Sequence, residues 1–221
     1  MCPCCSGNEN INDLDGFFDE KYQFRHANDY LRNGLSRESQ KLIDWVSSRL
    51  DGDESMMEIG CGGGMLHHEL LRNGKVSSAI GIDASSAGLK AAARNAETLG
   101  LTDDVAYHRQ DFAQNAEQHS AADLVVMDRV ICCYPHLDLL LGQAAEKANR
   151  YLAISFPIEN IVTKVGIKLA SFAFSLFGSG YHPYLHGPQN IRQTAESTGM
   201  RLVHTNRHYL WKIMVFERSE T

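Results

Sequence analysis

From about residue 36 onward, short apolar segments alternate with amphipathic ones. Helices are predicted at Met65–Arg72, Ser85–Leu99 and His136–Asn149. The apolar segments have the length and composition of strands, and they are Ser55–Ile59, Ala79–Asp83, Val105–His108, Asp123–Met127 and Tyr151–Phe156. Strands that alternate with helices in this way indicate right-handed crossovers and a parallel sheet that is covered on both faces.

The C-terminal part of the chain departs from this alternation. A helix is predicted at Gln189–Ser197, and the strands Arg201–Thr205 and Leu210–Arg218 follow it closely. Only Asn206–Tyr209 joins these two strands, whereas a parallel crossover needs about a dozen residues or more. The last strand is therefore expected to run antiparallel to its neighbour.

Two helical segments precede the first strand. Ser36 is a good N-cap for a helix whose apolar positions are Leu42, Ile43, Val46 and Leu50. The segment 17–33 is polar and aromatic, and it is predicted to form one or two helices that end at Gly34, outside the sheet. We therefore divide the chain into a tail and helical cap over residues 1–35 and a main domain over residues 36–221, with an insertion at 158–188.

Composition restricts the class of protein. The chain has 221 residues, a net charge of −6, 43% hydrophobic residues and 22% charged residues, which is typical of a globular protein. This acidic balance argues against a nucleic-acid partner. The N-terminus lacks the basic start and apolar run of a signal peptide, so a cytoplasmic protein is expected. Cys2, Cys4 and Cys5 are interpreted as a reduced, poorly ordered tail, with metal or redox chemistry as the alternative.

The strongest motif is the run Glu58-Ile59-Gly60-Cys61-Gly62-Gly63-Gly64, which lies between a predicted strand and a predicted helix. Glycines in this position allow a sharp turn and allow a ligand to lie against the main chain. A dinucleotide-binding loop requires G-x-G-x-x-G, and Met65 or His67 occupies the sixth position in the two registers. The sequence fits Glu-x-Gly-x-Gly-x-Gly instead, which disfavours a nicotinamide-dependent oxidoreductase.

This loop resembles the cofactor loop of class I S-adenosylmethionine-dependent methyltransferases. The resemblance continues at Asp83 after the second strand, at Arg109-Gln110-Asp111-Phe112 after the third, and at Asp123–Arg129 along the fourth. It implies a Rossmann-like α/β fold with a seven-stranded, mostly parallel sheet and a reversed C-terminal hairpin. It also implies S-adenosylmethionine as cofactor, with Asp83 on the ribose and Asp111 with its neighbour around the adenine. The cofactor contacts implied are Glu58, Gly60, Cys61, Gly62, Asp83, Ala84, Asp111, Phe112 and Asp128.

A narrower resemblance concerns the segment after the fourth strand. Cys133-Tyr134-Pro135 is similar to the region in which magnesium-protoporphyrin O-methyltransferases carry His-Tyr-Pro, with Cys133 in place of that histidine. The segments 18–22, 30–35 and 184–186 also look like parts of such proteins. This resemblance implies a tetrapyrrole carboxyl O-methyltransferase as one alternative function.

The insertion bears on the acceptor. Between Ile161 and Phe177 the polar residues fall on one narrow helical face, and the rest is apolar. This helix is interpreted either as a lid over the pocket or as a contact with a membrane surface or a large apolar ligand. The segment Tyr181–His186 is expected to line the acceptor pocket, with simple loop packing as the alternative and no metal site. His67 and His68 are interpreted as ordinary surface or packing residues.

The function predicted from these features is methyl transfer to oxygen or nitrogen of a small or mid-sized, largely apolar acceptor. The proposed catalytic residues are His186, Tyr134 and Tyr22, and the proposed substrate contacts are Arg25, Arg129, Cys133 and Tyr184. If His186 is the base, its removal should reduce turnover about 10²–10⁴-fold. The alternative from a different class is a cofactor-binding sensor or assembly subunit without catalysis.

Overall fold

The computed structural model describes residues 20–161, 163, 166 and 183–219. Seven strands form one sheet in the order β3-β2-β1-β4-β5-β7-β6. The strands are β1 (Ser55–Ile59), β2 (Ser78–Asp83), β3 (Val105–Arg109), β4 (Ala122–Asp128), β5 (Ala148–Pro157), β6 (Met200–His208) and β7 (Trp211–Arg218). The first five are parallel, and β7 is antiparallel to both β5 and β6, which confirms the predicted fold class.

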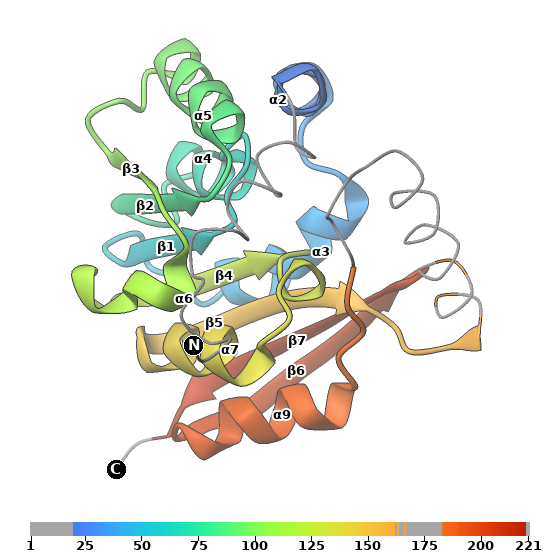
Figure 1. Cartoon of the computed structure of the whole chain (residues 1–221). Helices are drawn as coiled ribbons and strands as arrows, with labels where there is room; N and C mark the ends of the chain where they lie inside the picture. The colour runs from blue at the N-terminus through green and yellow to red at the C-terminus, as the bar shows by residue number, and fades with distance from the viewer. Residues whose placement is uncertain (1–19, 162, 164–165, 167–182, 220–221) are drawn as a thin grey trace, which may run out of the picture.

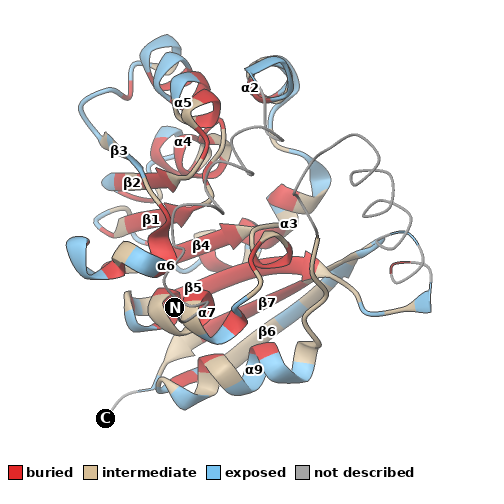
Figure 2. Cartoon of the chain, in the orientation of Figure 1, coloured by how far each residue is buried: buried red, intermediate tan, exposed pale blue. Residues whose placement is uncertain are grey.

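Helices cover both faces of this sheet (Figure 1). One face carries α3 (Arg37–Ser47), α4 (Met65–Arg72) and α5 (Ser86–Leu99), and the other carries α6 (Phe112–Asn115), α7 (Leu137–Glu146) and α9 (Pro188–Ser197). Each face of the sheet has its own buried apolar cluster, as the red strand segments in Figure 2 show. The central strands β1, β4 and β5 are buried on both sides, as expected of a parallel sheet between two helical layers.

Two predicted boundaries are wrong because strand pairing decides them. The helix expected at 136–149 ends at Glu146, since Ala148 already pairs with Ala122 at the start of β5. The hairpin link is shorter than expected: β6 continues to His208 and β7 begins at Trp211, one residue later than predicted, which leaves Tyr209 and Leu210 as the turn. Tyr209 has φ 48°, a left-handed conformation that suits a tight antiparallel turn.

The segment before α3 forms α2 (Glu20–Asn33), which packs against α5 and lies outside the sheet (Figure 1). It ends at Gly34, whose φ of 76° suits a helix C-terminus. The N-terminal cysteines and most of the segment 161–177 lie outside the described residues, so the predictions for them stay predictions. None of the helices that the structure describes is long and apolar enough to cross a membrane.

Candidate active site

A cavity of about 720 Å³ lies along the carboxyl edge of the parallel strands. It extends from the ends of β3, β2 and β1 to the ends of β4 and β5 and the beginning of β7, and α2 contributes to its wall. All but three of the predicted site residues line it. Those on the wall are Tyr22, Glu58, Gly60, Cys61, Gly62, Asp83, Ala84, Asp111, Phe112, Asp128, Arg129, Cys133 and Tyr134.

The glycine loop is held against the end of β2. The backbone N–H groups of Gly60 and Cys61 both donate to the carbonyl of Ile82, at 2.7 and 3.1 Å. Gly60 and Gly62 have φ values of 68° and 48°, which few other residues adopt without strain. A Cβ on Gly60 would stand 2.4 Å from Cγ2 of Val130. The loop therefore needs glycine both for its conformation and for its contact with the segment after β4.

Asp83 joins the glycine loop to the beginning of α5. Its Oδ2 accepts from the N–H of Gly62 at 2.6 Å, and its Oδ1 accepts from the N–H of Ser85 at 2.7 Å. These two bonds orient the carboxylate on the cavity wall. Each carboxylate oxygen has more than one acceptor site, so Asp83 can also accept from a diol such as a ribose.

Asp111 is bonded in a similar way at the end of β3. Its Oδ1 accepts from the N–H of Ala113 at 3.0 Å and so caps α6, while Oδ2 accepts from the hydroxyl of Tyr134 at 3.1 Å. Burial raises the pKa of Tyr134 to about 12, so its hydroxyl keeps its proton at neutral pH. Burial also raises the pKa of Asp111. Tyr134 thus acts in this structure as a donor that orients a predicted cofactor contact.

Glu58 is bonded to α4 at the other side of the glycine loop. Its Oε2 accepts from the backbone N–H of His67 at 3.1 Å and lies 2.6 Å from Nδ1 of the same residue. Burial, and after it the charge of Asp128, raises the pKa of Glu58 well above its usual range. Of the two interpretations of His67 and His68, that of surface residues is wrong and that of packing residues holds, since both are 0% exposed. His67 in particular belongs to the support of this acid.

The end of β4 is built around Asp128. Its Oδ1 accepts from Ser155 at 2.5 Å, and its Oδ2 accepts from Ser39 at 2.7 Å and from Nη2 of Arg129 at 3.1 Å. Arg129 has φ 61°, and its N–H donates to Oγ of Ser155 at 2.9 Å. Its guanidinium lies 5.8 Å from the ring centre of Trp211, which also lines the cavity. Arg129 is therefore fixed from both sides in a strained conformation.

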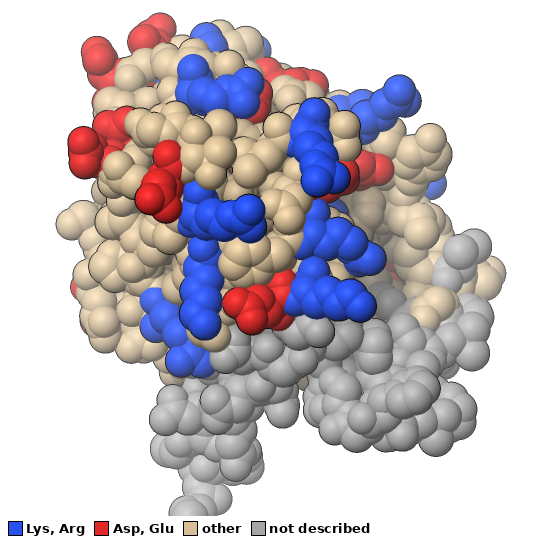
Figure 3. All heavy atoms as spheres, turned by 90° about the horizontal axis from the view of Figure 1, so that it is seen from above, with Lys and Arg blue, Asp and Glu red and all other residues tan. Residues whose placement is uncertain are grey.

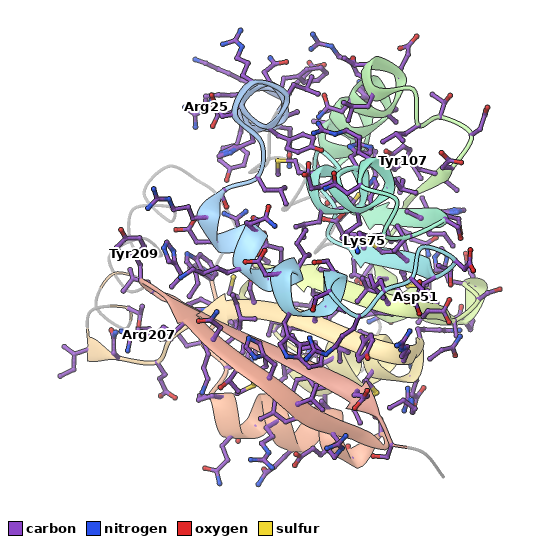
Figure 4. The ribbon with its side chains drawn as sticks, turned by 180° about the vertical axis from the view of Figure 1, so that it is seen from behind. Arg25, Asp51, Lys75, Tyr107, Arg207 and Tyr209 are labelled. Atoms are coloured by element: carbon purple, nitrogen blue, oxygen red, sulfur yellow. The ribbon has the colours of Figure 1, made fainter. Side chains whose placement is uncertain are left out.

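Three predicted residues are not among those lining the cavity. Arg25 is exposed on α2, where its guanidinium lies 6.0 Å from the Tyr22 ring (Figure 4). The N–H of Tyr184 donates to the carbonyl of Cys132 at 2.7 Å. Nε2 of His186 lies 2.9 Å from the carbonyl of Tyr134. Because a carbonyl only accepts, Nε2 carries the proton, and His186 supports the backbone at Tyr134.

The structure adds cavity residues that the sequence analysis missed, namely Gln23, His26, Ser39 and Trp211. His26 is half-buried on α2, and its ring lies 4.4 Å from that of Tyr22. Burial, followed by the charges of Arg25 and Arg129, lowers its pKa below the ordinary 6.5, so the imidazole is neutral near pH 7. The spacing of Tyr22, Gln23 and His26, which places them on one helix face, was the available signal.

Comparison with known proteins agrees with this geometry. Residues 50–165, more than half of the chain, match the model of a family described as "Methyltransferase domain". A ubiquinone biosynthesis O-methyltransferase from Coxiella burnetii is 27% identical over 164 residues, which are 70% of this chain and 67% of that protein. A ribosomal protein L11 methyltransferase from Chromobacterium violaceum is 33% identical over 84 residues, 38% of this chain. The match spans only about a quarter of that relative, 26%.

The fold is also that of solved methyltransferases. Magnesium protoporphyrin IX methyltransferase from Synechocystis PCC 6803, with bound S-adenosylhomocysteine, has a TM-score of 0.73 and 20% identity over 95% of this chain and 100% of its own. The chain belongs to the methyltransferase domain family, and its fold is that of the class I S-adenosylmethionine-dependent enzymes.

The residues on the wall fit the cofactor of this class. The side chain of Glu58 is only 5% exposed, and its Oε1 has no protein partner among the described residues although Glu58 lines the cavity. Such an acceptor suits an ammonium group. The loop at Gly60–Gly62 presents backbone without side chains, and Asp83 and Asp111 are placed at the neighbouring strand ends. In the described part of the chain, no three His, Cys, Asp or Glu side chains converge to hold a metal ion.

Proposed function

We propose that the protein transfers a methyl group from S-adenosylmethionine to an oxygen of a small or mid-sized acceptor with a largely apolar body. The observation that carries this proposal is the composition of the cavity wall beyond the cofactor residues. At the ends of β4 and β5 and the beginning of β7, the apolar lining residues are Val130, Pro157, Pro183, Leu210 and Trp211. Apolar walls with few polar groups suit a ring compound with one reactive hydroxyl or carboxyl.

The cavity follows the order of the strands. Because β3, β2 and β1 carry the cofactor residues and β4, β5 and β7 follow in the same sheet, the acceptor lies beside the cofactor. When bound, S-adenosylmethionine supplies an electrophilic methyl group. The residues of the chain have to align the acceptor oxygen behind that methyl at about 3–3.5 Å and exclude water.

His26 is the group best placed to take the proton of the acceptor. It lies on the cavity wall. Its lowered pKa favours the neutral form of the imidazole, which can accept a proton. In the reaction the acceptor oxygen forms a bond to the methyl carbon and the carbon–sulfur bond breaks, with its electron pair on sulfur. The proton of a hydroxyl acceptor passes to the imidazole of His26 and then to water, whereas a carboxyl acceptor is already ionised near neutral pH and has no proton to transfer.

The distribution of charge on the surface supports a small molecule as the acceptor. In Figure 3, acidic side chains lie between the Lys and Arg side chains of the face that is seen from above. Together with the net charge of −6, this mixture supports a small acceptor over a nucleic acid. Among the residues that the structure describes, Cys61 and Cys132 are buried thiols outside any disulfide, which supports a reducing compartment such as the cytoplasm.

The proposal is tested with the purified protein, S-adenosylmethionine and a panel of apolar phenols, ring carboxylic acids and amines. S-adenosylhomocysteine production and the mass of the product are followed. We expect turnover on one or more phenols or carboxylic acids, with a gain of one methyl group on oxygen. Turnover on amines alone would contradict O-methylation. Tight cofactor binding without turnover, together with a co-purifying protein, would favour the non-catalytic alternative.

A further inference from the structure

Four polar side chains form a hydrogen-bonded chain beneath the glycine loop, of which Glu58, His67 and His68 are buried and Tyr107 is half-buried. From Glu58, at the end of β1, the chain passes to Nδ1 of His67 at 2.6 Å. It continues from Nε2 of His67 to the hydroxyl of Tyr107 at 3.1 Å, and from that hydroxyl to Nε2 of His68 at 2.7 Å. Figure 4 shows Tyr107 beside the helices that cover this end of the sheet. The chain thus connects β1, α4 and β3.

Two glycines make room for these rings. A Cβ on Gly64 would stand 2.6 Å from Cε1 of His68 and 2.8 Å from Cε1 of His67. A Cβ on Gly81, which pairs with Tyr107 across β2 and β3, would stand 2.9 Å from the Tyr107 ring. Glycine at these two positions is therefore needed for the rings of the hydrogen-bonded chain to fit.

Counting protons fixes the direction of every bond. An ionised Glu58 only accepts, so Nδ1 of His67 must carry the proton and Nε2 of that neutral ring must accept. The single hydroxyl proton of Tyr107 then goes to His67, and Nε2 of His68 must donate to Tyr107. The proton-free atom is then Nδ1 of His68, and this atom is buried without a hydrogen-bond partner among the described residues. Burial keeps both imidazoles neutral, lowering the pKa of His67 to about 3 and that of His68 as well.

A proton on Oε2 of Glu58 would reverse the chain. Oε2 would donate to Nδ1 of His67, whose Nε2–H would donate to Tyr107, and the hydroxyl of Tyr107 would donate to Nε2 of His68. His68 would then carry its proton on Nδ1, where it has no acceptor among the residues that the structure describes. A buried donor without a partner is costly. The chain therefore keeps Oε2 as the acceptor of two hydrogen bonds, which favours the ionised carboxylate and leaves Oε1 as the oxygen that an added proton would occupy.

We propose that His67, Tyr107 and His68 are positioning residues that present Glu58 to the cofactor cavity as an ionised carboxylate, with the tautomers of both histidines fixed by the bond to Oε2. The free Oε1 would bind the ammonium group of the cofactor, and this part rests on the proposed function. The other titratable groups near Glu58 are Asp128 on β4, Tyr30 on α2 and Cys61 in the glycine loop. Burial opposes ionisation of Glu58 most strongly and the charge of Asp128 adds to it, and the two donors on Oε2 counteract both.

The sign of the pH dependence follows. Because an ammonium group favours the ionised form, binding of S-adenosylhomocysteine should release a proton wherever free Glu58 is protonated. Affinity should rise as the pH rises through the apparent pKa of Glu58 and then become constant. His67 and His68 should keep the same tautomers over this interval, because the proton leaves Oε1 and the bonds to Oε2 are unchanged.

The test is nitrogen-15 NMR of the histidine rings in the whole protein, without ligand and with S-adenosylhomocysteine. With the ligand near neutral pH, we expect His67 protonated at Nδ1 and His68 at Nε2. Tyr107→Phe removes the hydroxyl that fixes both rings, so His68 should no longer be held with its proton on Nε2, and S-adenosylhomocysteine binding should weaken roughly 3–10-fold, as loss of a buried hydrogen bond implies. The matched control is Tyr151→Phe, which removes another tyrosine hydroxyl from a strand that contributes nothing to this chain. It should change neither reading.

A second pair of variants guards against a folding defect. His67→Asn keeps a donor near the position of Nδ1 and should retain S-adenosylhomocysteine affinity within about 3-fold, whereas His67→Leu should lose roughly 10-fold or more. His67 protonated at Nε2 in the bound protein, or equal affinity in all four variants, would overturn the inference. If the expected tautomers are present but the wild-type chain binds no S-adenosylhomocysteine, the proposed function fails while the internal chain of bonds stands.

Discussion

The hydroxyl of Tyr134 donates a hydrogen bond of 3.1 Å to Oδ2 of Asp111, and this bond links the segment after β4 to the segment after β3. Both residues line the cavity, one beside the acceptor region and one at the adenine end implied by the family resemblance. Tyr134 also receives a bond at its backbone carbonyl from His186. The tyrosine is thus held at both ends, and its position is coupled to the cofactor residues.

Replacing Tyr134 with Phe removes this bond and leaves the ring in place. We expect S-adenosylhomocysteine affinity to fall by about 1 kcal/mol, roughly 5-fold, because Asp111 loses a donor that orients it. Since that donor lowers the pKa of Asp111, the pH below which binding weakens should move upward. Titration calorimetry over a pH series measures both effects. A large loss of turnover at unchanged affinity would instead place the hydroxyl in the chemical step.

Asp83→Asn should weaken S-adenosylhomocysteine binding by roughly 1–3 kcal/mol, because an NH2 group replaces one carboxylate oxygen and cannot accept, so one of the bonds from Gly62 and Ser85 is lost together with an acceptor for the cofactor. Asp123→Asn is the matched control. Asp123 accepts from the N–H and hydroxyl of Ser55 at the opposite edge of the sheet. That variant should lose thermal stability and keep its affinity. Equal losses of affinity in both would show a general folding effect.

Gly60→Ala should be compared with Gly100→Ala. Both glycines have positive φ, 68° and 71°, but only Gly60 has a close neighbour, Val130. The left-handed conformation alone costs an alanine about 1–2 kcal/mol, which we expect for Gly100→Ala in chemical denaturation. Gly60→Ala should cost more and should also abolish measurable S-adenosylhomocysteine binding. Retained affinity in Gly60→Ala would mean that the backbone of the glycine loop does not contact the cofactor.

Replacement of His26 and replacement of His186 should affect turnover differently. His26→Ala should reduce turnover about 10²–10⁴-fold at nearly unchanged cofactor affinity, as loss of a general base implies. His186→Gln, which keeps a donor to the Tyr134 carbonyl, should leave turnover within about 3-fold, and His186→Ala should lower it about 10-fold or less. The reverse ranking would return the role of base to His186.

The pH profile gives a separate test of His26. A base must be unprotonated, and burial together with Arg25 and Arg129 lowers the pKa of His26. Turnover should therefore rise with pH on a limb that lies below pH 6.5 and be constant above it. The limb should be absent from the residual activity of His26→Ala. A limb centred above that pH in the wild-type chain would exclude His26 as the base.

The position of the proposed cofactor residues on the cavity wall could be predicted from sequence because these residues follow directly from strand ends. The glycine loop and Asp83 each lie within a few residues of a strand, and parallel strands bring their carboxyl ends to one edge. Their positions on the cavity wall thus needed only the order of the strands.

Residues whose environment depends on distant contacts could not be predicted in this way. His67 and His68 read as polar helix residues, yet Tyr107 on β3 and Glu58 on β1 supply their hydrogen bonds. His26 reaches the cavity only because α2 packs on α5 beside the glycine loop. Local pattern carries no information on such tertiary packing, and for the same reason it placed the end of α7 too late.

The central claim is that this cavity binds S-adenosylmethionine, and the most direct measurement is titration calorimetry with S-adenosylhomocysteine. We predict saturable binding with one site per chain and a dissociation constant below about 100 μM, equivalent to more than about 5.5 kcal/mol. Asp83→Asn should weaken it and Asp123→Asn should not. No heat of binding up to that concentration, from a folded wild-type protein, would contradict the account.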